Sequence, residues 1–545
     1  MNKKRVILPL VAVIVLLITS GYTRRLYEVT KQIEIFTGLY KKLHESYVDE
    51  TNPAELMEAA IDAMLGQLDP YTKFWNEQDV EAAKIRNAGE YTGIGAVVKT
   101  IDDRILIIEP YKDYPADRAG LKAGDEIIKI GNTELKDYKN DAGELLKGAP
   151  GSQVALTYKR QGKVNTTQLT RREIEVKAVP YYTLLNDKTG YIVLSKFNRK
   201  AAAETTNAFK DLKSKGATKM ILDLRNNPGG LMDQAISIAN IFLPKDRLIT
   251  KTKSAVKEYS KEYRTRDDAL DTNIPLVVLV NGRSASASEI VAGAIQDWDR
   301  GVVIGARSFG KGLVQRPMPL KYNTKLKITI SRYYTPSGRC IQALDYWNRD
   351  KENRPVRIQE KDYKAYKTLL NNRLVYDGGG ILPDVELETT KTSSITKALL
   401  NDNAIFDYSV DYYYKHPGMN TSNDFSFTDR DYQDFTNFIK NSSFNYETKT
   451  EESLDEVLRI AKNEEFSDDI KNSLNGVTLA IERAKDKELQ DKRPEIEALL
   501  TDEIIKRYSY REGLFQYYIA NNPEIKKGQD ILSNLSQYNR ILNYK

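Results

Sequence analysis

The sequence predicts a multidomain α+β protein, and three observations lead to that expectation. First, 545 residues exceed what one hydrophobic core usually organises. Second, the hydrophobic pattern changes along the chain, from helical spacing to short β-rich runs and then to alternating strands and helices. Third, 41% hydrophobic and 29% charged residues are typical of globular domains, and this composition excludes a mostly disordered chain or a polytopic membrane protein.

The first 25 residues predict a signal anchor. A basic start, Asn2–Arg5, precedes an uncharged run from Val6 to Tyr22, and Arg24 and Arg25 follow. Such a run lies at the short limit for a membrane span and at the long end for a signal peptide. No A-x-A cleavage site follows it, so we expect an uncleaved anchor, although cleavage near Gly21 stays open. The rest of the chain is then exported, periplasmic or otherwise extracytoplasmic, and tethered to the inner (cytoplasmic) membrane.

Four further segments are expected after the anchor. Residues 26–83 show helical spacing of apolar residues, and residues 84–175 contain short β runs separated by turns, with a short helix from Pro115 to Ala119. Residues 176–390 alternate strands with helices, which indicates an α/β domain. Residues 391–545 are charged, Tyr-rich and mostly helical, and they carry no recognisable chemistry. The α/β segment has its helices at Arg199–Lys213, Met232–Phe242 and Glu289–Trp298.

Rare residue types narrow the chemistry that is open to the chain. The single cysteine, Cys340, excludes an internal disulfide and a Cys-rich zinc site. The two histidines, His44 and His416, lie at opposite ends, so neither a His-dependent triad nor a multi-His metal centre is expected. We expect no metal and no organic cofactor. The net charge of +6 is small for this length, and nucleic acid is therefore not an expected partner.

A first candidate site follows the apolar strand PLVVLV. The segment Asn281–Glu289 carries three alternating serines at the end of a strand and the start of a helix, where α/β proteins bind ligands and where free amides suit an oxyanion. The stretch Ser286–Glu289 also fits a helix capping box, and three serines alone do not identify a nucleophile.

A second candidate site is the glycine-rich segment Gly305–Gly312. It nearly matches a phosphate-binding loop, but Gly312 replaces the magnesium-binding hydroxyl and a strand-like run follows in place of a helix. Ser308 and Lys311 also mimic the S-x-x-K pattern, which needs a helical turn that Phe309-Gly310 disfavours. Lys311, if bent toward apolar groups, would have a lowered pKa and could act as a general base; the alternative is a solvated loop lysine.

Two further glycine motifs complete the candidates. In Asp223–Gly230, two glycines after a proline expose amides that could donate to an oxyanion, or they form an ordinary tight turn. In Gly93–Ala96, a Gly-x-Gly loop before an edge strand could bind a C-terminal carboxylate, and the strand could then add a peptide to its sheet.

Together these motifs resemble the C-terminal processing peptidases, also called tail-specific proteases, over roughly residues 30 to 390. AGLKAGDEIIKI resembles a PDZ domain, whereas LDLRNNPGG, SASASEIVAGAIQD, GARSFGKGLVQ and YYTPSGR resemble blocks of the catalytic domain. The resemblance implies a serine peptidase whose α/β core is related to the crotonase and Clp-protease fold. Cys340 stands where the family pattern suggests a serine, and no catalytic role depends on that position.

The resemblance implies a role for each matching residue. Ser286 would be the nucleophile, Lys311 its base, and Gln315 the group that orients Lys311. The amide of Ala287 and one from Gly229 or Gly230 would form the oxyanion hole. The tail-binding residues implied by the resemblance are Gly93, Ile94, Gly95 and Ala96.

The expected function is that of an envelope serine endopeptidase that recognises apolar C-terminal tails and cleaves through an acyl-enzyme. Its partners would be protein or peptide substrates and the membrane, with a homo-oligomer or an adaptor left open. One alternative is an inactive PDZ-bearing envelope scaffold, which the presence of Ser286, Lys311 and Gln315 disfavours. Another is a crotonase-like acyl-CoA enzyme, which an exported chain with a peptide-binding module disfavours.

Overall fold

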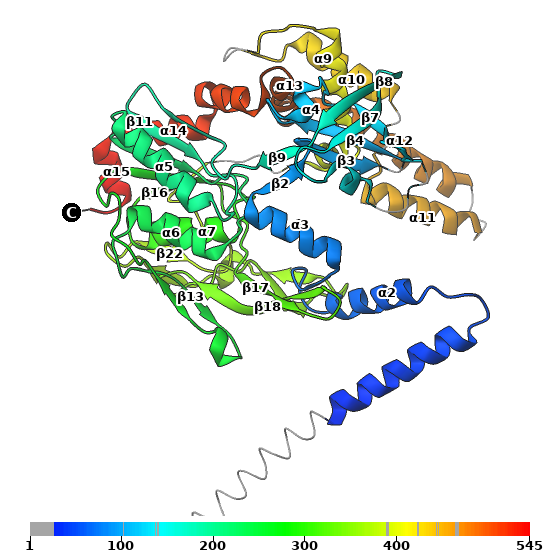
Figure 1. The fold of residues 1–545 in the computed structure, drawn as a ribbon, viewed down its shortest axis with the longest axis horizontal. Coiled ribbons are helices and arrows are strands. Elements are labelled where there is room, and N and C mark those ends of the chain that lie inside the picture. Colours follow the sequence, from blue (N-terminus) through cyan, green and yellow to red (C-terminus); the bar gives the residue numbers. More distant parts are fainter. Residues whose placement is uncertain are drawn as a thin grey trace, which may run out of the picture. The chain divides into compact units, whose positions relative to one another are not determined.

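A computed structural model describes most of the chain, and Figure 1 shows its fold as a ribbon. The described residues are 27–101, 103–136, 138, 141–387, 392–421, 425–442, 444, 446–463 and 468–544. The predicted signal anchor, residues 1–25, lies outside them. Among the described residues, no helix has both the length and the apolar character that a bilayer span requires. The chain divides into two compact units, Met1–Asn76 with Arg316–Thr329 and Glu77–Gln315 with Ile330–Lys545, and each is described by itself.

Residues 27–76, the described part of the N-terminal segment of the first unit, are mainly helical, as the spacing of their apolar residues predicts. Residues 27–46 form a helix, and α2 (Pro53–Gly66) starts after Asn52, whose side chain accepts two amide hydrogens of the first turn. One short segment differs from the predicted helix: β1 (Lys73–Trp75) pairs antiparallel with the start of β18 (Lys325–Tyr334). That strand depends on a partner about 250 residues away, which local periodicity does not reveal.

The β-rich part of the second unit is a small antiparallel sheet with strand order β3-β4-β5-β7-β8. Its edge strand β3 follows directly after Gly95, and the predicted short helix forms as α4, which ends before Gly120. The elements here are α3 (Glu77–Ala88), β2 (Glu90–Gly93), β3 (Ala96–Ile101), β4 (Arg104–Pro110), α4 (Pro115–Arg118), β5 (Glu126–Ile130), β6 (Thr133–Glu134), η1 (Ala142–Leu146), β7 (Gln153–Arg160), β8 (Lys163–Thr170) and β9 (Arg172–Glu175).

The α/β part contains a six-stranded sheet with strand order β10-β11-β12-β15-β16-β23. Pairing is parallel from β11 to β23, and only β10 runs antiparallel to its neighbour. The predicted alternation of strands and helices is therefore confirmed. The elements are β10 (Tyr181–Leu184), β11 (Thr189–Val193), α5 (Ala201–Ser214), β12 (Lys219–Asp223), α6 (Met232–Phe242), β15 (Leu276–Val280), α7 (Ala287–Asp297), β16 (Val302–Gly305) and β23 (Val385–Glu386).

Both faces of this sheet are covered, and the second cover comes from the end of the chain. Alternate strand residues such as Leu222 and Val278 pack with α5, α6 and α7. Their neighbours Ile221 and Val277 pack instead with α14 (Pro523–Ser533) and α15 (Leu535–Ile541). The last two helices of the C-terminal region are thus part of the hydrophobic core of the α/β domain.

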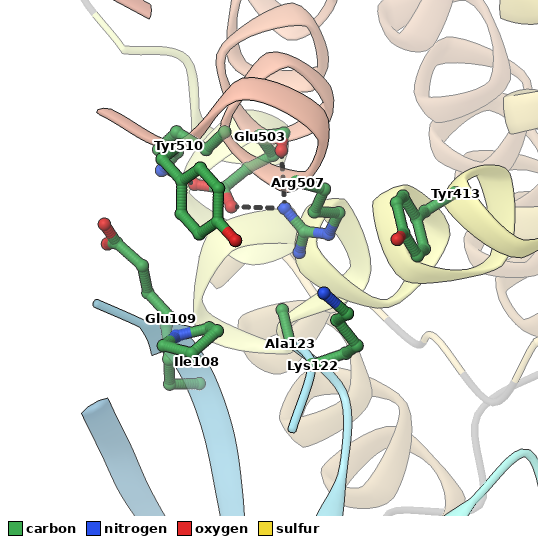
Figure 2. A pocket seen from close by; sticks show the side chains of 10 residues that line it. Ile108, Glu109, Lys122, Ala123, Tyr413, Glu503, Arg507 and Tyr510 are labelled. Atoms are coloured by element: carbon green, nitrogen blue, oxygen red, sulfur yellow. Dashed lines mark hydrogen bonds and ion pairs between the residues drawn. The ribbon is translucent and has the colours of Figure 1, made fainter. Parts of the chain in front are cut away.

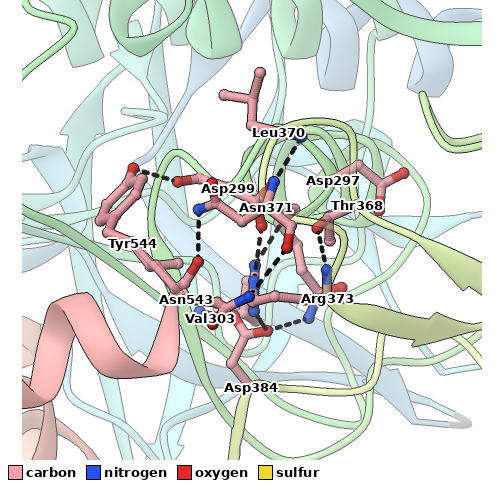
Figure 3. Close-up of polar contacts among 12 residues, drawn as sticks. Asp297, Asp299, Val303, Thr368, Leu370, Asn371, Arg373, Asp384, Asn543 and Tyr544 are labelled. Atoms are coloured by element: carbon pink, nitrogen blue, oxygen red, sulfur yellow. Dashed lines mark hydrogen bonds and ion pairs between the residues drawn. The ribbon is translucent and has the colours of Figure 1, made fainter.

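Polar contacts fix the end of the chain to the same domain (Figure 3). The guanidinium of Arg373 lies between the carboxylates of Asp299 and Asp384, at 2.7 and 2.5 Å. The hydroxyl of Tyr544 donates to the backbone carbonyl of Asp299 at 2.6 Å. The Tyr544 hydrogen bond and the apolar packing of α14 and α15 hold the C-terminal residues against this sheet.

The remaining elements are short strands and a helical region. In the second unit, β13 (Leu248–Lys253) pairs with β14 (Glu262–Arg264) and with the end of β18. The charged stretch between β18 and β23 forms two hairpins, β19 (Leu344–Arg349) with β20 (Pro355–Arg357) and β21 (Ala365–Lys367) with β22 (Leu374–Tyr376). The predicted C-terminal helices are α8 (Ser394–Asn401), α9 (Ala404–Lys415), α10 (Asp429–Asn441), α11 (Lys449–Asn463), α12 (Asp468–Asp491) and α13 (Arg493–Asn521).

Candidate active site

The three serines between the end of β15 and the first turn of α7 differ in their burial and hydrogen bonding. Ser284 and Ser288 are fully buried, and their hydroxyls donate to the carbonyls of Leu224 and Asn227 at 2.8 and 2.9 Å. Ser286 is partly exposed and has φ 56° and ψ −110°, a backbone conformation that is strained for any residue with a side chain. Two serines therefore hold the turn in place, and the third, Ser286, is the one presented to solvent.

One buried carboxylate joins this turn to the lysine loop. Glu289 is fully buried, and its Oε2 accepts the amide hydrogens of Ser286 at 2.8 Å and Lys311 at 3.0 Å. Its Oε1 accepts the amide of Gly310 at 2.7 Å and the hydroxyl of Ser308 at 2.6 Å. Burial raises the pKa of Glu289, whereas these four hydrogen bonds favour the charged form. The capping interaction predicted for Glu289 is present, and it also brings the two candidate loops together.

A tyrosine hydroxyl makes a second connection between the same two loops. Tyr333, near the end of β18, is almost fully buried, and its hydroxyl donates to the backbone carbonyls of Ser286, at 3.2 Å, and of Lys311. The backbones of Ser286 and Lys311 are therefore held side by side from both their amide and their carbonyl groups.

Two alternative interpretations of the loop Gly305–Gly312 are a phosphate-binding loop and an S-x-x-K motif. The structure has the features of neither. The segment after Gly312 forms strand β17 (Leu313–Pro319), whereas a phosphate-binding loop opens a helix. No helical turn spans residues 308–311, and the Ser308 hydroxyl is engaged by Glu289, which is unlike an S-x-x-K nucleophile. Gln315 lies within β17 and is partly exposed, as is Lys311.

The glycine loop after β12 lies against the Ser286 turn. A Cβ atom on Gly229 would lie 2.9 Å from both the amide nitrogen of Ala287 and the Cβ of Ser286. The amide of Gly229 already donates to the side chain of Asn227 at 2.9 Å. Gly230 has φ +149°, and a Cβ there would come within 2.3 Å of a neighbouring carbonyl oxygen. Of the two glycines, Gly230 is therefore the better candidate for an oxyanion donor, together with Ala287 in the first turn of α7.

The predicted tail-binding loop has a fixed backbone. The carbonyls of Ile94 and Gly95 each accept an amide hydrogen at 2.8 Å, from Ala116 and Tyr111 respectively. Gly95 has φ +74°, and a Cβ there would lie 2.5 Å from the side chain of Tyr114. The loop can therefore keep its shape without using its own amides at Ile94 and Gly95 for these contacts.

An apolar cavity of about 200 Å³ opens beside this loop. Gly93, Ile94 and Ala96 form part of its wall, and β3 is an unpaired edge of its sheet on that side. The other lining residues are Ile85, Tyr91, Val98, Gly143, Leu146 and Lys147. A loop, an edge strand and an apolar cavity are the three features that β-strand addition of a peptide tail requires.

Sequence reasoning missed part of this arrangement. It gave Glu289 only a capping role, and it gave Tyr333 and Asn227 none. The S-x-x-E spacing was a visible signal for Glu289. No local pattern marks Tyr333, because its hydroxyl contacts a carbonyl 47 residues away in the sequence.

Family models match three parts of the chain. Peptidase family S41 matches residues 188–345, and a PDZ domain matches residues 92–170. A third model, described as the C-terminal helical domain of a probable PDZ-protease, matches residues 395–532. The helical region in which sequence reasoning found no recognisable chemistry is therefore also similar to a known protease domain.

Several known proteins are similar to most of the chain. A carboxy-terminal-processing protease of Bartonella bacilliformis is 37% identical over 321 residues, which cover 58% of this chain and 73% of that protein. A probable CtpA-like serine protease of Staphylococcus aureus (strain MRSA252) is 31% identical over 383 residues, with coverages of 69% and 74%. Among solved structures, a photosystem II D1 C-terminal processing protease is 28% identical, with coverages of 65% and 92% and a TM-score of 0.36.

A PDZ domain joined to a peptidase core defines the class of protein as a serine peptidase with a peptide-binding module. More closely, the chain belongs to peptidase family S41, and its relatives are named carboxy-terminal-processing proteases.

Proposed function

We propose that the chain is a serine endopeptidase that binds apolar C-terminal tails through its PDZ domain and cleaves peptide bonds with Ser286 and Lys311. The observation that carries this proposal is the shared acceptor: one Glu289 oxygen receives the amides of both residues. A dyad needs its nucleophile and its base at a fixed separation, and a common buried carboxylate supplies that constraint.

The reaction balances with these groups alone. Neutral Lys311 accepts the proton of the Ser286 hydroxyl while Oγ attacks the scissile carbonyl carbon, and the negative charge on the carbonyl oxygen is stabilised by the amides of Gly230 and Ala287. The C–N bond then breaks, and the departing amine takes the proton from Lys311. Water, with Lys311 again as base, hydrolyses the ester and restores Ser286. Gln315 orients the Lys311 amine, and no cofactor takes part.

Tail recognition uses the cavity beside β3. The substrate carboxylate accepts hydrogen bonds from amides in the loop Gly93–Ala96, the last residues pair with β3, and the terminal apolar side chain enters the cavity. Lys311 must lose its charge to act as a base, so the site has to be partly dry during the reaction. Tail binding by the PDZ domain is the proposed gate, and deletion of residues 90–174 should abolish the preference for tailed substrates.

The proposed compartment is extracytoplasmic, with residues 1–25 as the membrane tether. The positive start and the uncharged run that follows it support this assignment. A homo-oligomer or an adaptor are further proposed partners. Fractionation of cells that produce the full chain, compared with a chain starting at residue 26, tests the tether. Release of the shortened chain from the membrane fraction supports it, and equal partitioning of the two chains contradicts it.

The activity is tested with an unfolded protein that ends in an apolar tail, followed by gel electrophoresis. Wild type should degrade it, whereas Ser286→Ala and Lys311→Met should not. Lys245→Met is the matched control, because Lys245 is exposed and should be dispensable. Full activity of Lys311→Met would reject the lysine base. Degradation by wild type and Ser286→Ala alike would reject the nucleophile, and no degradation by wild type would favour the inactive scaffold.

A further inference from the structure

Helix α13 contacts the PDZ domain at a bend within the helix, at Tyr510 and Arg511, and its C-terminal end leads to the loop that carries the candidate oxyanion glycines. We propose that α13 and the start of α14 couple tail binding to the oxyanion loop, and that Glu524 and Asn522 are positioning residues for that loop. The inference rests on the proposed function, because it concerns the same tail-binding and oxyanion sites. The partner that the PDZ domain contacts is therefore a segment of this same chain, in the helical region after residue 391.

The PDZ end of the coupling consists of two adjacent residues. The hydroxyl of Tyr510 donates to Oδ1 of Asp117 at 2.6 Å, and the guanidinium of Arg511 binds both carboxylate oxygens of Glu109 at 2.7 Å each. Asp117 belongs to α4, one residue after Ala116, whose amide holds the tail-binding loop at Ile94. The PDZ residues that contact α13 are therefore the close neighbours of those that fix the proposed carboxylate site.

A small cavity of about 40 Å³ lies beside this contact. Figure 2 shows the side chains that line it. Glu109 and Lys122 of the PDZ domain face Tyr510 and Arg507 of α13 across it. Arg507 pairs with Glu503 at 2.8 Å, but its Nε atom is buried without a hydrogen-bond partner. A contact with a cavity and an unsatisfied buried donor is less tightly packed than a domain core, and it can be remodelled at low cost.

The helix is bent at the contact residue itself. Tyr510 has φ 56° and ψ −165°, which interrupts α13 and separates two helical halves. Across that bend, the hydroxyl of Tyr518 donates to Oδ2 of Asp502 at 2.5 Å. Because Asp502 lies before the bend and Tyr518 after it, this bond fixes the angle between the halves. A shift of Tyr510 at the PDZ contact is thus transmitted to the second half of α13.

The second half of α13 ends at a buried arginine of the catalytic domain. Arg225 donates from Nη1 to Oδ1 of Asn522 at 2.8 Å and to the carboxylate of Glu524. Its other nitrogens bind Asp223, with Nη2 2.6 Å from Oδ2 and Nε 2.9 Å from Oδ1. The Arg225 side chain is only 8% exposed, so a lost partner would leave a buried charge with fewer acceptors.

Arg225 lies within the loop that carries the candidate oxyanion glycines. Two residues later, the carbonyl of Asn227 accepts the amide of Ala285 at 3.0 Å and the hydroxyl of Ser288 at 2.9 Å. The side chain of Asn227 accepts the amide of Gly229. A displaced Arg225 would therefore move the loop that borders the Ser286 turn on one side and presents Gly230 on the other.

Lys196, whose charge is affected by Arg511, precedes the segment that pairs with this loop. The pKa of Lys196 is lowered by burial and by the nearby Arg511. Its neighbour Phe197 pairs with the glycine loop: the Phe197 amide donates to Gly229 and the Phe197 carbonyl accepts from Leu231, at 3.1 and 2.8 Å. The charge of Arg511 therefore acts on the residue next to the segment that flanks the candidate oxyanion donor.

The test compares one peptide substrate ending in a free apolar carboxylate with the same peptide ending in a carboxamide. In the full chain, Glu524→Gln should lower kcat on the tailed peptide about tenfold while KM changes less than about twofold, because the loop is mispositioned after binding. The ratio of kcat between the tailed and amidated peptides should fall toward one. Glu524→Asp, which keeps the carboxylate, should restore part of the loss.

The PDZ end of the coupling is tested with Glu109→Gln. This variant should also lower the ratio of kcat between the tailed and the amidated peptide. If one element couples the two ends, the kcat ratio of the double variant Glu109→Gln/Glu524→Gln should be no lower than that of the more affected single variant. Glu512→Gln is the matched control, since Glu512 lies on α13 next to Arg511 and is exposed. Binding of a fluorescent tail peptide to Ser286→Ala/Glu524→Gln should equal binding to Ser286→Ala alone.

Two results would overturn the coupling. One is an unchanged kcat for Glu524→Gln, or a loss that is equal on both peptides, as a purely structural role would produce. The other is full multiplication of the two single effects in the double variant. Failure of the proposed function looks different: wild type would cleave neither peptide, or Ser286→Ala would cleave both.

Discussion

The two contacts that organise the proposed protease differ in their exposure to water. Glu289, which joins the Ser286 and Lys311 loops, is fully buried and accepts four hydrogen bonds. The ion pair that joins α13 to the PDZ domain is partly exposed, because the side chain of Arg511 is 53% exposed and that of Glu109 is 14% exposed. A buried carboxylate loses each partner at high cost, whereas an exposed ion pair contributes at most about 1 kcal/mol. The candidate catalytic loops are therefore fixed, whereas this contact of the PDZ domain can change.

The largest effect is expected from removing the buried acceptor. Glu289→Ala would leave the amides of Ser286, Gly310 and Lys311 without their acceptor. Each buried donor left unsatisfied costs about 1–3 kcal/mol, so we expect the melting temperature to fall and peptide cleavage to drop more than about a hundredfold. Thermal unfolding and peptide hydrolysis measure the two effects.

Glu289→Gln removes the negative charge of the side chain and keeps its size and shape. The amide keeps one acceptor oxygen but points donors at groups that are themselves donors, so activity should stay low while the fold is less affected. Wild-type turnover in Glu289→Gln would show that the carboxylate does not hold the loops, and the contrast between the two contacts would then fail.

A smaller effect is expected from the second connection between the same loops. Tyr333→Phe removes one hydroxyl, which donates to the carbonyls of Ser286 and Lys311, and it leaves the ring in place. Loss of about 1 kcal/mol of hydrogen bonding predicts a fall in kcat of about five- to tenfold with KM nearly unchanged. A change confined to KM would place Tyr333 in substrate binding instead.

The difference between the two contacts also explains what the sequence could predict. Local patterns predicted α6 with its observed bounds, Met232–Phe242, and the turn at Gly93–Ala96, because periodicity and glycine placement act within a few residues. The contact of Arg225 with Glu524 spans 299 positions, and no local signal marks it. The cover of the catalytic sheet by α14 and α15 was hidden for the same reason.

An effect of intermediate size is expected at the hydrogen bond between Tyr518 and Asp502, which crosses the bend of α13. Burial raises the pKa of Asp502 from 3.8 to about 6. The folded state therefore binds this proton more tightly than the unfolded chain, so Asp502 lowers stability as the pH rises from about 4 past 6, by about 1–3 kcal/mol. Asp502→Asn keeps an acceptor for Tyr518 and should raise the melting temperature at pH 8 but not at pH 4. A lower melting temperature at pH 8 would contradict this sign.

The smallest effect on stability is expected at the PDZ contact itself. Arg511→Gln removes a half-exposed ion pair with Glu109, so the free energy of unfolding should change by less than about 1 kcal/mol. The same variant should still lower the preference for tailed over amidated peptides. Denaturant unfolding and the kcat ratio, measured on one preparation, sharpen the comparison, and a large stability loss would show that this contact is as rigid as the catalytic loops.

The most direct test of the central claim is to trap the acyl-enzyme and locate it by mass spectrometry. An activated ester of a tail peptide is mixed with wild type and quenched in acid, and the protein is then digested. The acyl group should be found on Ser286 in wild type, accumulate much more slowly in Lys311→Met and be absent from Ser286→Ala. An adduct on Ser284, Ser288 or Ser308, or peptide cleavage without any adduct on Ser286, would contradict the proposed dyad.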